Sequence, residues 1–563
     1  MKSYTIHRFL SGKYTHMSKG LVVIFALLLP VFGMAQFEII AGNDPAPIIR
    51  TDVRKIPEAA KTKDTVLQVP NFNYGIQSKK VSTSFELDTI KAAKMGGEPL
   101  QKLYRTYTKL GVGNYSSMMG EFNVMSVRSK NGSWGAHVSH WSAGSGPKDV
   151  AGEFAGYSAQ NFDLFGNRFT KKHELSGGFG FDRDVVYNYG STADSNVFTR
   201  DYSRQKYNFY NTEFGVKSYY ADSEAVNHNI RFGYQYFDNR VGVTEDRLLV
   251  NVNANRYIRT EMIDATFGID YNRVSGLGDT TNSAIVKFVP RFIAQGKKYQ
   301  VYAGAGVFHE TDLGGQTHFY PMFYAQYDIV NHIIIPYISY GGELERNNYH
   351  SLTAKNPFIA SYNAVNLRNT ERTRALEVGL KGTLSAEIFY QVSAAMYKLR
   401  NAPFFVNTTL ADEPMQNKFN VVYDGADVLH VGGQLGWQKR EKIKVIATGD
   451  WYQYSMDAEL KPWHTPTLRM SLLTSYNLED KFLVHSEVYY LNGQYARTGT
   501  AATGYGVKNL KGLVDVNLGV EYRYNKYLSL YVDFRNIANQ RYMRWNGYPT
   551  QKFNLMGGLT YTF

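Results

Sequence analysis

The C-terminal fifty or so residues, from Leu513 to Phe563, constrain the fold most strongly because apolar and polar side chains alternate along them. One side of an extended segment would carry Val514, Val516, Leu518, Val520, Tyr522 and Tyr524. The other side would carry Asp515, Asn517, Gly519, Glu521, Arg523 and Asn525. Such a strand needs an apolar medium on one face and water on the other. A soluble sandwich and a membrane barrel both provide this, so a single strand fits either.

The same alternation recurs along the chain, in segments 230–236, 299–307, 376–381, 528–535 and 553–563. Only Asn525-Lys526 separates two of the C-terminal segments, which predicts a tight hairpin. Tyrosines near the predicted strand ends would lie at headgroup depth in a membrane, where an aromatic ring with a polar tip is favoured. Ordinary β-propensity also favours tyrosine.

The connections between the predicted strands sort into two classes by length. From Arg105 onward, ten mostly short breaks, such as the tight-turn signature Asn131-Gly132, alternate with eleven others. The longest of the second class are Asn347 to Thr373, Ala402 to Leu429 and Asn492 to Lys511. Short turns at one end and long loops at the other are typical of outer-membrane barrels, and a sandwich gives no reason for this sorting. The predicted fold class is therefore all-β, a transmembrane antiparallel up-and-down β-barrel of about 22 strands over residues 105–563.

A second hydrophobic signal lies at the N-terminus. Leu21 to Met34 is an apolar run preceded by Lys19, and it is too short for a helical membrane span. Small residues at Gly33 and Ala35 predict a secretory signal peptide, residues 1–35, cleaved after Ala35. A membrane anchor is the alternative, which the length of the run and Pro30 disfavour. The predicted location is the cell outer membrane.

Residues 36–104 are rich in proline and mixed charge, and they hold too few apolar clusters to form an independent core. We expect a periplasmic tail or a segment inserted into the barrel lumen. The chain has no cysteine, which excludes disulfides and thiolate metal sites. The net charge of +13 is scattered rather than clustered, which argues against nucleic-acid binding.

The stretch Tyr527 to Phe563 resembles the C-terminal strand pair of TonB-dependent receptors. The resemblance rests on Asp533 to Asn539, Arg541-Tyr542 and Tyr548-Pro549. The final residues, with Gly558, Tyr561 and the terminal Phe563, are similar to the aromatic-ended signal that barrel-assembly machinery reads. The resemblance implies an outer-membrane barrel for passage or uptake of a solute, with outer-membrane lipid and the assembly machinery as partners.

The N-terminal part departs from that family. TonB-dependent receptors carry a plug domain and a TonB-binding box before the barrel, and residues 36–104 are too few for a full plug. The run Ile76 to Leu103 is instead similar to plug-less barrels of this superfamily in Bacteroidota. A 22-stranded barrel left open would leak, so either residues 36–104 or a protein partner should close it.

The residues with inward parity are the candidates for lining the lumen. They are Arg231, Lys287, Arg291, His485, Glu487, Asp515, Glu521, Arg523, Asp533 and Arg535. Both signs of charge occur, which suits internal ion-pair networks as well as a selectivity surface.

Two pairs of residues are candidates for chemistry. His485 and Glu487 are two apart on one strand, so both should point inward, either as a polar pair or as the catalytic pair of a barrel hydrolase. His137 and His140 are three apart and should face opposite ways, which argues against shared metal binding. No phosphate loop, metal-ligand spacing or nucleophile elbow occurs, so we expect no enzyme activity and no cofactor. The alternative to transport is a non-transporting scaffold or accessory subunit of an outer-membrane complex, with a periplasmic or outer-membrane protein as partner.

Overall fold

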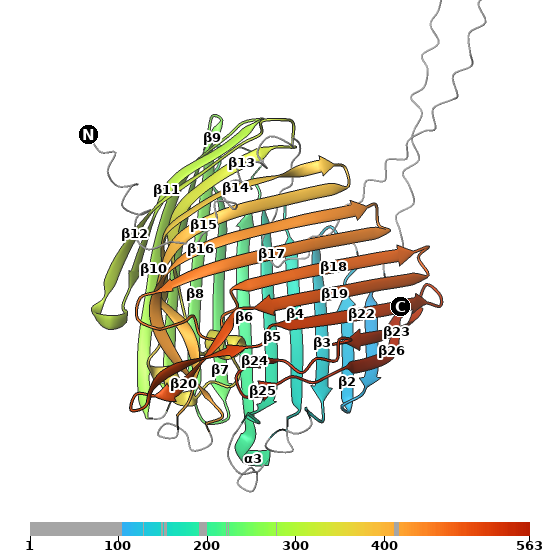
Figure 1. The fold of residues 1–563 in the computed structure, drawn as a ribbon. Coiled ribbons are helices and arrows are strands. Elements are labelled where there is room, and N and C mark those ends of the chain that lie inside the picture. Colours follow the sequence, from blue (N-terminus) through green and yellow to red (C-terminus); the bar gives the residue numbers. More distant parts are fainter. Residues whose placement is uncertain are drawn as a thin grey trace, which may run out of the picture. The chain divides into compact units, whose positions relative to one another are not determined.

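The computed structural model describes residues 104–127, 129–147, 150, 155–190, 200–220, 222, 224–276, 278–409 and 416–563. Its main feature is one antiparallel sheet of 22 strands that closes on itself (Figure 1). The first strand, β1 (Thr106–Gly113), pairs with β2 (Ser117–Met125) on one side and with the last strand, β26 (Asn554–Thr562), on the other. The predicted fold class and strand number are confirmed. The predictions for residues 1–103 lie outside the described residues.

The remaining strands follow one another around the wall. They are β3 (Gly132–Ala143), β4 (Tyr157–Phe169), β5 (His173–Tyr187), β6 (Arg204–Ser218), β7 (Asn227–Asn239), β8 (Thr244–Ile258), β9 (Glu261–Gly276), β10 (Asp279–Gln295), β11 (Tyr299–Glu310), β12 (Gln316–Tyr327), β13 (Ile335–Glu345), β14 (Thr370–Ser385), β15 (Ile388–Asn407), β16 (Phe419–Lys439), β17 (Ile443–Met456), β18 (Leu468–Leu478), β19 (Phe482–Asn492), β22 (Leu513–Arg523) and β23 (Leu528–Arg535).

The outer face of the wall is apolar. In β1, Leu110 and Val112 are 50% and 66% exposed, whereas Lys109, directly before Leu110, points to the inner face, where it lies over the ring of Tyr531. Similar alternation places Phe214 in β6 and Phe319 in β12 on the outside. In the described part of the chain no helix is long and apolar enough to cross a membrane. Since large apolar side chains cover the outside of a closed sheet, the wall is suited to a hydrocarbon environment.

Closure of the sheet depends on glycine at the seam between β1 and β26. A Cβ added at Gly558 would lie 1.9 Å from the carbonyl oxygen of Leu110, and one added at Gly113 would lie 2.4 Å from the carbonyl oxygen of Leu555. The Tyr531 side chain occupies the space where Gly111 has none, with its hydroxyl 2.0 Å from that position. The first and last strands can therefore approach each other only because these positions lack side chains.

The connections sort to the two ends as predicted. We call the end with connections such as 259–260, 386–387 and 479–481 the short-turn end, and the opposite end the long-loop end. The long-loop connections contain the elements that are not strands of the wall. They are α3 (Arg200–Ser203), η2 (Asp312–Gly314), α4 (Tyr349–Lys355), η3 (Ser361–Val365) and two hairpins, β20 (Gln494–Thr500) with β21 (Gly504–Leu510) and β24 (Met543–Trp545) with β25 (Tyr548–Pro549). In Figure 1 the labels α3, β20, β24 and β25 lie toward the lower end of the barrel.

One predicted connection was wrong in extent. Residues 402–429 were assigned to a loop, but β15 and β16 remain paired out to Asn407 and Phe419, which leaves only 408–418 between them. The two strands continue past a register shift between Leu399 and Ala402, and Phe404 and Val406 beyond it are buried. Their burial against other loop residues supports the pairing where the alternating pattern in the sequence ends.

Candidate functional site

The connection between β13 and β14, residues 346–369, folds back against the inner face of the wall. Its helix α4 is capped by Asn348 and Ser351, which exchange hydrogen bonds between side chain and backbone in a capping box. The carboxylate of Glu245, a buried residue at the start of β8, accepts the backbone N–H of Tyr349 at 2.7 Å and the side-chain amide of Asn348. A wall strand thus completes the cap of a loop helix, which fixes the helix against β8.

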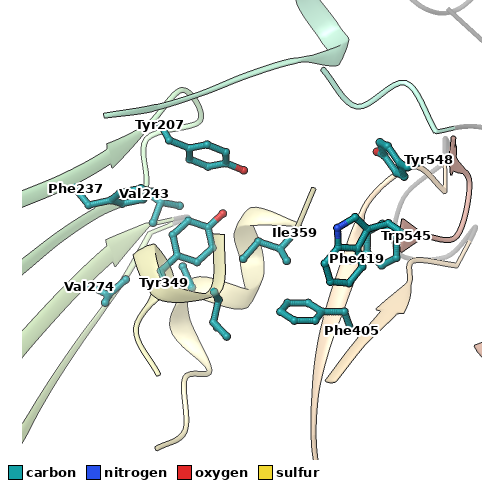
Figure 2. Close-up of a cluster of buried hydrophobic side chains, with 12 residues drawn as sticks. Tyr207, Phe237, Val243, Val274, Tyr349, Ile359, Phe405, Phe419, Trp545 and Tyr548 are labelled. Carbon is teal, nitrogen blue, oxygen red and sulfur yellow. The ribbon is translucent and has the colours of Figure 1, made fainter. Parts of the chain in front are cut away.

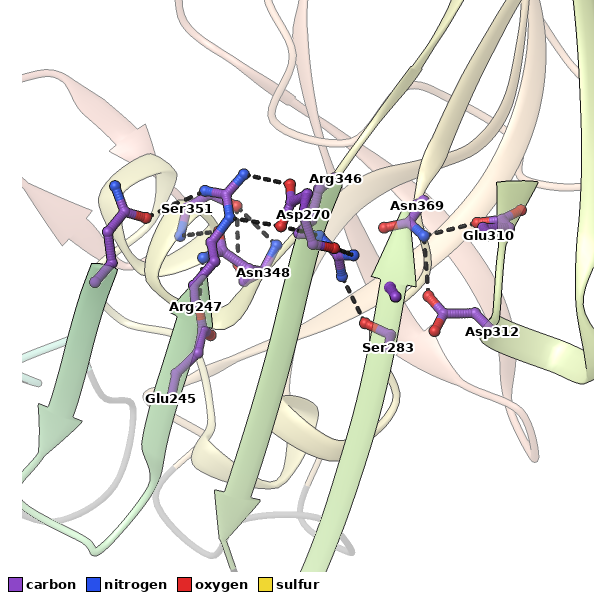
Figure 3. A network of polar contacts seen from close by, with 12 residues as sticks. Glu245, Arg247, Asp270, Ser283, Glu310, Asp312, Arg346, Asn348, Ser351 and Asn369 are labelled. Atoms are coloured by element: carbon purple, nitrogen blue, oxygen red, sulfur yellow. Dashed lines mark hydrogen bonds and ion pairs between the residues drawn. The ribbon is translucent and has the colours of Figure 1, made fainter. Parts of the chain in front are cut away.

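Arg346 holds the beginning of this connection. Its Nε lies 2.9 Å from Asp270 of β9, and it also donates to Ser283 of β10 at 2.5 Å. Arg247 of β8 makes a bidentate contact with the same Asp270, at 3.0 and 2.7 Å. Asp270 therefore lies between two guanidinium groups, one from the wall and one from the connection (Figure 3). Bidentate pairing of this kind is strong and directional.

Asn369 holds the other end of the connection. Its side-chain amide donates to Glu310, the last residue of β11, at 2.7 Å and to Asp312 at 2.9 Å (Figure 3). Next to it, His318 of β12 contacts Glu310 at 2.9 Å and Glu371 at 3.0 Å. Both ends of residues 346–369 are thus bound to the inner faces of the barrel strands by charge-assisted contacts.

An apolar core joins the long-loop connections to one another (Figure 2). It is built from inward residues of the wall, from α4 and η3, and from the end of the β15–β16 pair and the β24–β25 hairpin: Tyr207, Phe237, Val243, Val274, Tyr349, Leu352, Ile359, Ala364, Phe405, Phe419, Trp545 and Tyr548. Tyr207 donates its hydroxyl to the carbonyl of Pro357 at 2.6 Å, and Tyr548 donates to the carbonyl of Asn417. Buried aromatic side chains whose hydroxyl groups are satisfied give a rigid assembly.

His464 links three segments at the long-loop end. Its Nδ1 donates to the carbonyl of Phe405 at 2.8 Å, and its Nε2 accepts the backbone N–H of Asn546 at 3.2 Å. Its ring also packs against Phe419 and Trp545. Burial lowers the pKa of His464 to about 4, against the opposing effect of the Phe405 carbonyl. The imidazole is therefore neutral at pH 7, with the proton on Nδ1.

A cavity of about 720 Å³ remains between residues 346–369, the inner faces of β9 and β10, and β16. Its walls are strongly polar and include Asn272, Asn347, Asn363, Arg346, Arg368 and Tyr423. The side-chain NH₂ of Asn347 donates to the hydroxyl of Thr370 and to the carbonyl of Arg368, and these two bonds identify the other side-chain atom as the oxygen Oδ1. That oxygen has no hydrogen-bond partner among the described residues.

Charged groups of both signs line the cavity, with Asp312 beside three arginines. Arg346 and Arg497 are paired with Asp270 and with Glu459, at 2.9 and 3.1 Å. Arg368 is exposed and forms no ion pair with the residues that the structure describes. Amide groups, a phenol and an unpaired guanidinium together suit a polar solute that carries hydroxyl groups or an acidic group.

The predicted lumen residues of β7 and β10 lie on the face opposite the exposed apolar side chains. Arg231 falls between Ile230 and Phe232, which are both exposed on the outer face. Arg291 pairs with Asp264 of β9 at 2.5 Å. Lys287 passes over Gly268, where an added Cβ would lie 2.5 Å from its side chain.

His485 and Glu487 have separate partners. His485 lies 3.7 Å from Asp533 of β23, and Glu487 accepts a hydrogen bond from Tyr489. Asp533 also lies 3.9 Å from Lys109 of β1. The hydrogen-bonded His485–Glu487 pair expected from sequence is absent from the described contacts, because the cross-strand neighbour of His485 is Gly519, which leaves its ring free to reach Asp533.

The other C-terminal candidates are distributed along the strands. Asp515 accepts a hydrogen bond from Tyr542 at 2.5 Å, and the guanidinium of Arg535 lies 4.0 Å from the ring centre of Trp141. Both line a second cavity of about 430 Å³ at the long-loop end. Arg523 lies near the short-turn end, 3.8 Å from Asp480. Glu521 is half-buried, between Leu483 and Tyr531 in the sheet.

Two residues of the predicted assembly signal lie on the last strand, and the third, Phe563, follows it directly. Tyr561 and Phe563 are 43% and 57% exposed on the outer face, with ring centres 5.6 Å apart, whereas Gly558 forms part of the closure seam. His137 lies near Glu121 and Asp163, and His140 contacts Ser142, so the two imidazoles point to different faces. No group of three or more potential metal ligands occurs in the described ranges.

The sequence did not reveal residues 346–369, or the wall residues that contact them, as a functional site. Arg346, Asn347 and Asn348 form a polar run directly after β13, and further asparagines follow up to Asn369. That composition is a weak signal for a loop with many hydrogen bonds. It does not indicate that the loop turns inward, since Asp270 and Glu245 are far away in the sequence.

Comparison with known proteins identifies the fold. No family model and no curated protein sequence matches this chain. Among solved structures it is similar to the FrpB iron transporter from Neisseria meningitidis, with a TM-score of 0.63, 10% identity and 82% of each chain covered. It is also similar to the ferric-catecholate import receptor Fiu from Escherichia coli K12, with a TM-score of 0.60, 11% identity and 82% of each chain covered. A third is the pyoverdine outer membrane receptor FpvA from Pseudomonas aeruginosa, with a TM-score of 0.61, 12% identity and 82% and 79% coverage. At these identities the comparison establishes a shared barrel fold.

Proposed function

We propose that this protein is an outer-membrane β-barrel of TonB-dependent receptor type that takes part in the passage or uptake of a polar solute across the outer membrane. The observation that carries the proposal is the closed 22-stranded sheet, with an apolar outer face and a charged inner face. The fold likeness to outer-membrane receptors and transporters supports it. In the proposed orientation the short-turn end faces the periplasm and the long-loop end faces the exterior.

The solute would bind first in the 720 Å³ cavity at the long-loop end. Its walls offer amides, tyrosine hydroxyl groups and the guanidinium of Arg368, which recognise hydroxyl or acidic groups. Residues 346–369 form one side of that cavity and cross the inner face of the wall. Movement of this connection would therefore couple occupation of the cavity to passage through the lumen.

Conductance in planar lipid bilayers tests the proposal. We expect residues 36–563 to conduct weakly, because residues 346–369 cross the inner face of the wall and narrow the lumen. Replacing residues 347–368 by a short Gly-Ser linker should raise the single-channel conductance several-fold. Near-zero conductance in every variant, including one that also lacks residues 36–104, would contradict passage through this barrel.

Affinity isolation separates the proposal from a scaffold role. If the protein works as a lone pore, tagged protein extracted from native membranes should not be accompanied by any other protein at a fixed ratio. Recovery with other outer-membrane proteins at a constant ratio, together with no conductance, would favour an accessory subunit.

A further inference from the structure

A groove interrupts the apolar outer face near the short-turn end, on strands β3 to β6. Its floor is formed by Gly166 of β4 and Gly177 of β5, which are direct cross-strand partners. Next along the same row lie Trp134 of β3, the partner of Gly166, and Phe214 of β6, the partner of Gly177. Direct partners point to the same face of a sheet, so these four positions form one continuous outer row.

Large aromatic side chains stand at both ends of this row, and the two central positions are glycines. Trp134 and Phe214 are 53% and 58% exposed on the outer face, whereas Gly166 and Gly177 carry no side chain. The Phe214 ring leans toward Gly177, where an added Cβ would lie 3.6 Å from it. Three strand spacings separate the two aromatic residues, which is roughly 14 Å between their backbones. The hollow has a volume of about 610 Å³. Leu164 and Phe179 lie in the next outer row, on the side away from the short-turn end, so the groove continues onto an apolar surface.

The end of the groove nearest the short turns is basic. Arg168 lies two residues after Gly166 on the outer face, and it lines the hollow together with Leu175, its cross-strand partner. Lys130, Lys171 and Lys172 lie exposed in the two neighbouring turns. Residues 126–131 and 166–173 contain no acidic residue. Within the described part of the chain, Arg168 and these three lysines form no ion pair.

This combination fits the two parts of an anionic phospholipid. An acyl chain is apolar and matches the glycine floor between the two aromatic walls. A phosphate group matches the guanidinium of Arg168, whose planar donors pair with phosphate oxygens. A charged side chain on the lipid face costs little only near the membrane interface, which is where the end of β4 would lie.

We propose that this groove binds a membrane phospholipid with an anionic headgroup, with one acyl chain over Gly166 and Gly177 and the phosphate on Arg168. The inference depends on the proposed membrane location, but not on passage of a solute. The bound lipid would be a fixed part of the barrel surface on the side that the short turns mark.

Native mass spectrometry of residues 36–563 in mild detergent tests the inference, with phosphatidylglycerol and phosphatidylcholine of identical chains as probes. We expect phosphatidylglycerol to remain bound at a concentration about tenfold lower than phosphatidylcholine, which corresponds to about 1.4 kcal/mol. Gly166→Leu should reduce retention of both lipids. A Cβ at position 166 meets no atom closer than 3.9 Å, so the substitution fills the groove without a backbone clash at that atom.

Gly449→Leu is the matched control. Gly449 also lies on a wall strand, an added Cβ there meets nothing within 4 Å, and it is remote from the groove. Arg168→Gln should abolish the preference for phosphatidylglycerol while acyl retention persists. Retention in Gly166→Leu equal to that of the control, or equal retention of both lipids by the wild-type protein, would overturn the inference. Folding of every variant is checked by the mobility shift between heated and unheated samples on detergent gels. If the conductance measurements contradicted passage of a solute, the expected retention of phosphatidylglycerol would stay the same.

Discussion

At the scale of single residues, two buried histidines make the long-loop end sensitive to acid. Burial lowers the pKa of His464 to about 4, and burial together with the charge of Arg247 lowers that of His350 in α4 to about 4. Both values lie below the ordinary value of 6.5, so the unfolded chain binds protons more readily than the folded one. The stabilisation is fully present above pH 6.5 and is lost as the pH falls toward 4.

We therefore expect acidification from pH 7 to pH 4 to loosen the long-loop connections before the barrel wall. A difference of 2.5 pKa units corresponds to about 3 kcal/mol for His464. Limited proteolysis at a series of pH values measures the effect. The double variant His464→Gln with His350→Gln should be less stable at pH 7 and should lose less stability than the wild-type protein as the pH falls to 4. An equally steep pH dependence in that variant would assign the effect to other groups.

Gly558 is a single residue on which closure of the whole sheet depends. Gly558→Ala places a methyl group 1.9 Å from the carbonyl oxygen of Leu110, which forces the first and last strands apart. We expect a large loss of folded protein, measured as the fraction that shifts mobility on heating in detergent gels. Gly449→Ala serves as the control, because its Cβ meets open space. Normal yield of the Gly558→Ala protein would show that the seam tolerates a wider gap.

At the scale of elements, residues 346–369 behave as a unit tied down at both ends. Arg346 is almost fully buried against Asp270, whereas Lys355 of α4 makes an exposed pair with Glu345 at 3.7 Å. Removing one partner of a buried pair leaves an uncompensated charge, and exposed pairs contribute little. The two cations on one connection should therefore differ sharply in importance.

Arg346→Met should weaken attachment of this connection by about 3 kcal/mol and increase both its cleavage by protease and the single-channel conductance. Lys355→Met, the control on the same connection, should leave both measurements close to those of the wild-type protein. Similar behaviour of the two variants would show that Asn369 and the apolar core hold residues 346–369 without Arg346.

At the scale of the whole molecule, the outer face decides the environment. Apolar side chains such as Val112, Phe214 and Phe319 are more than half exposed on it. We expect residues 36–563 to be monodisperse in detergent and to aggregate when the detergent is removed, as measured by light scattering after size-exclusion chromatography. A monodisperse protein without detergent would overturn the membrane location and the proposed transport together.

The barrel itself could be predicted from the sequence because its signal is local. Alternation with a period of two fixes which side chains of β22, β23 and β26 face outward. The spacing of turn residues gives 22 strands, with the start of β1 and the end of β26 both at the short-turn end. The error at residues 402–429 arose where tertiary burial of Phe404 and Val406 extends a strand pair past the alternating pattern.

By itself, then, the sequence determined the fold class, the strand number and the two faces of the wall, because each depends on neighbours a few residues apart. Only the tertiary structure decided the arrangement of the long-loop end. The contacts of Arg346 with Asp270, Tyr349 with Glu245 and Trp545 with Phe419 join residues that are 76 or more positions apart in the chain. Such contacts have no period in the sequence, since they depend on where the closed wall brings distant loops together.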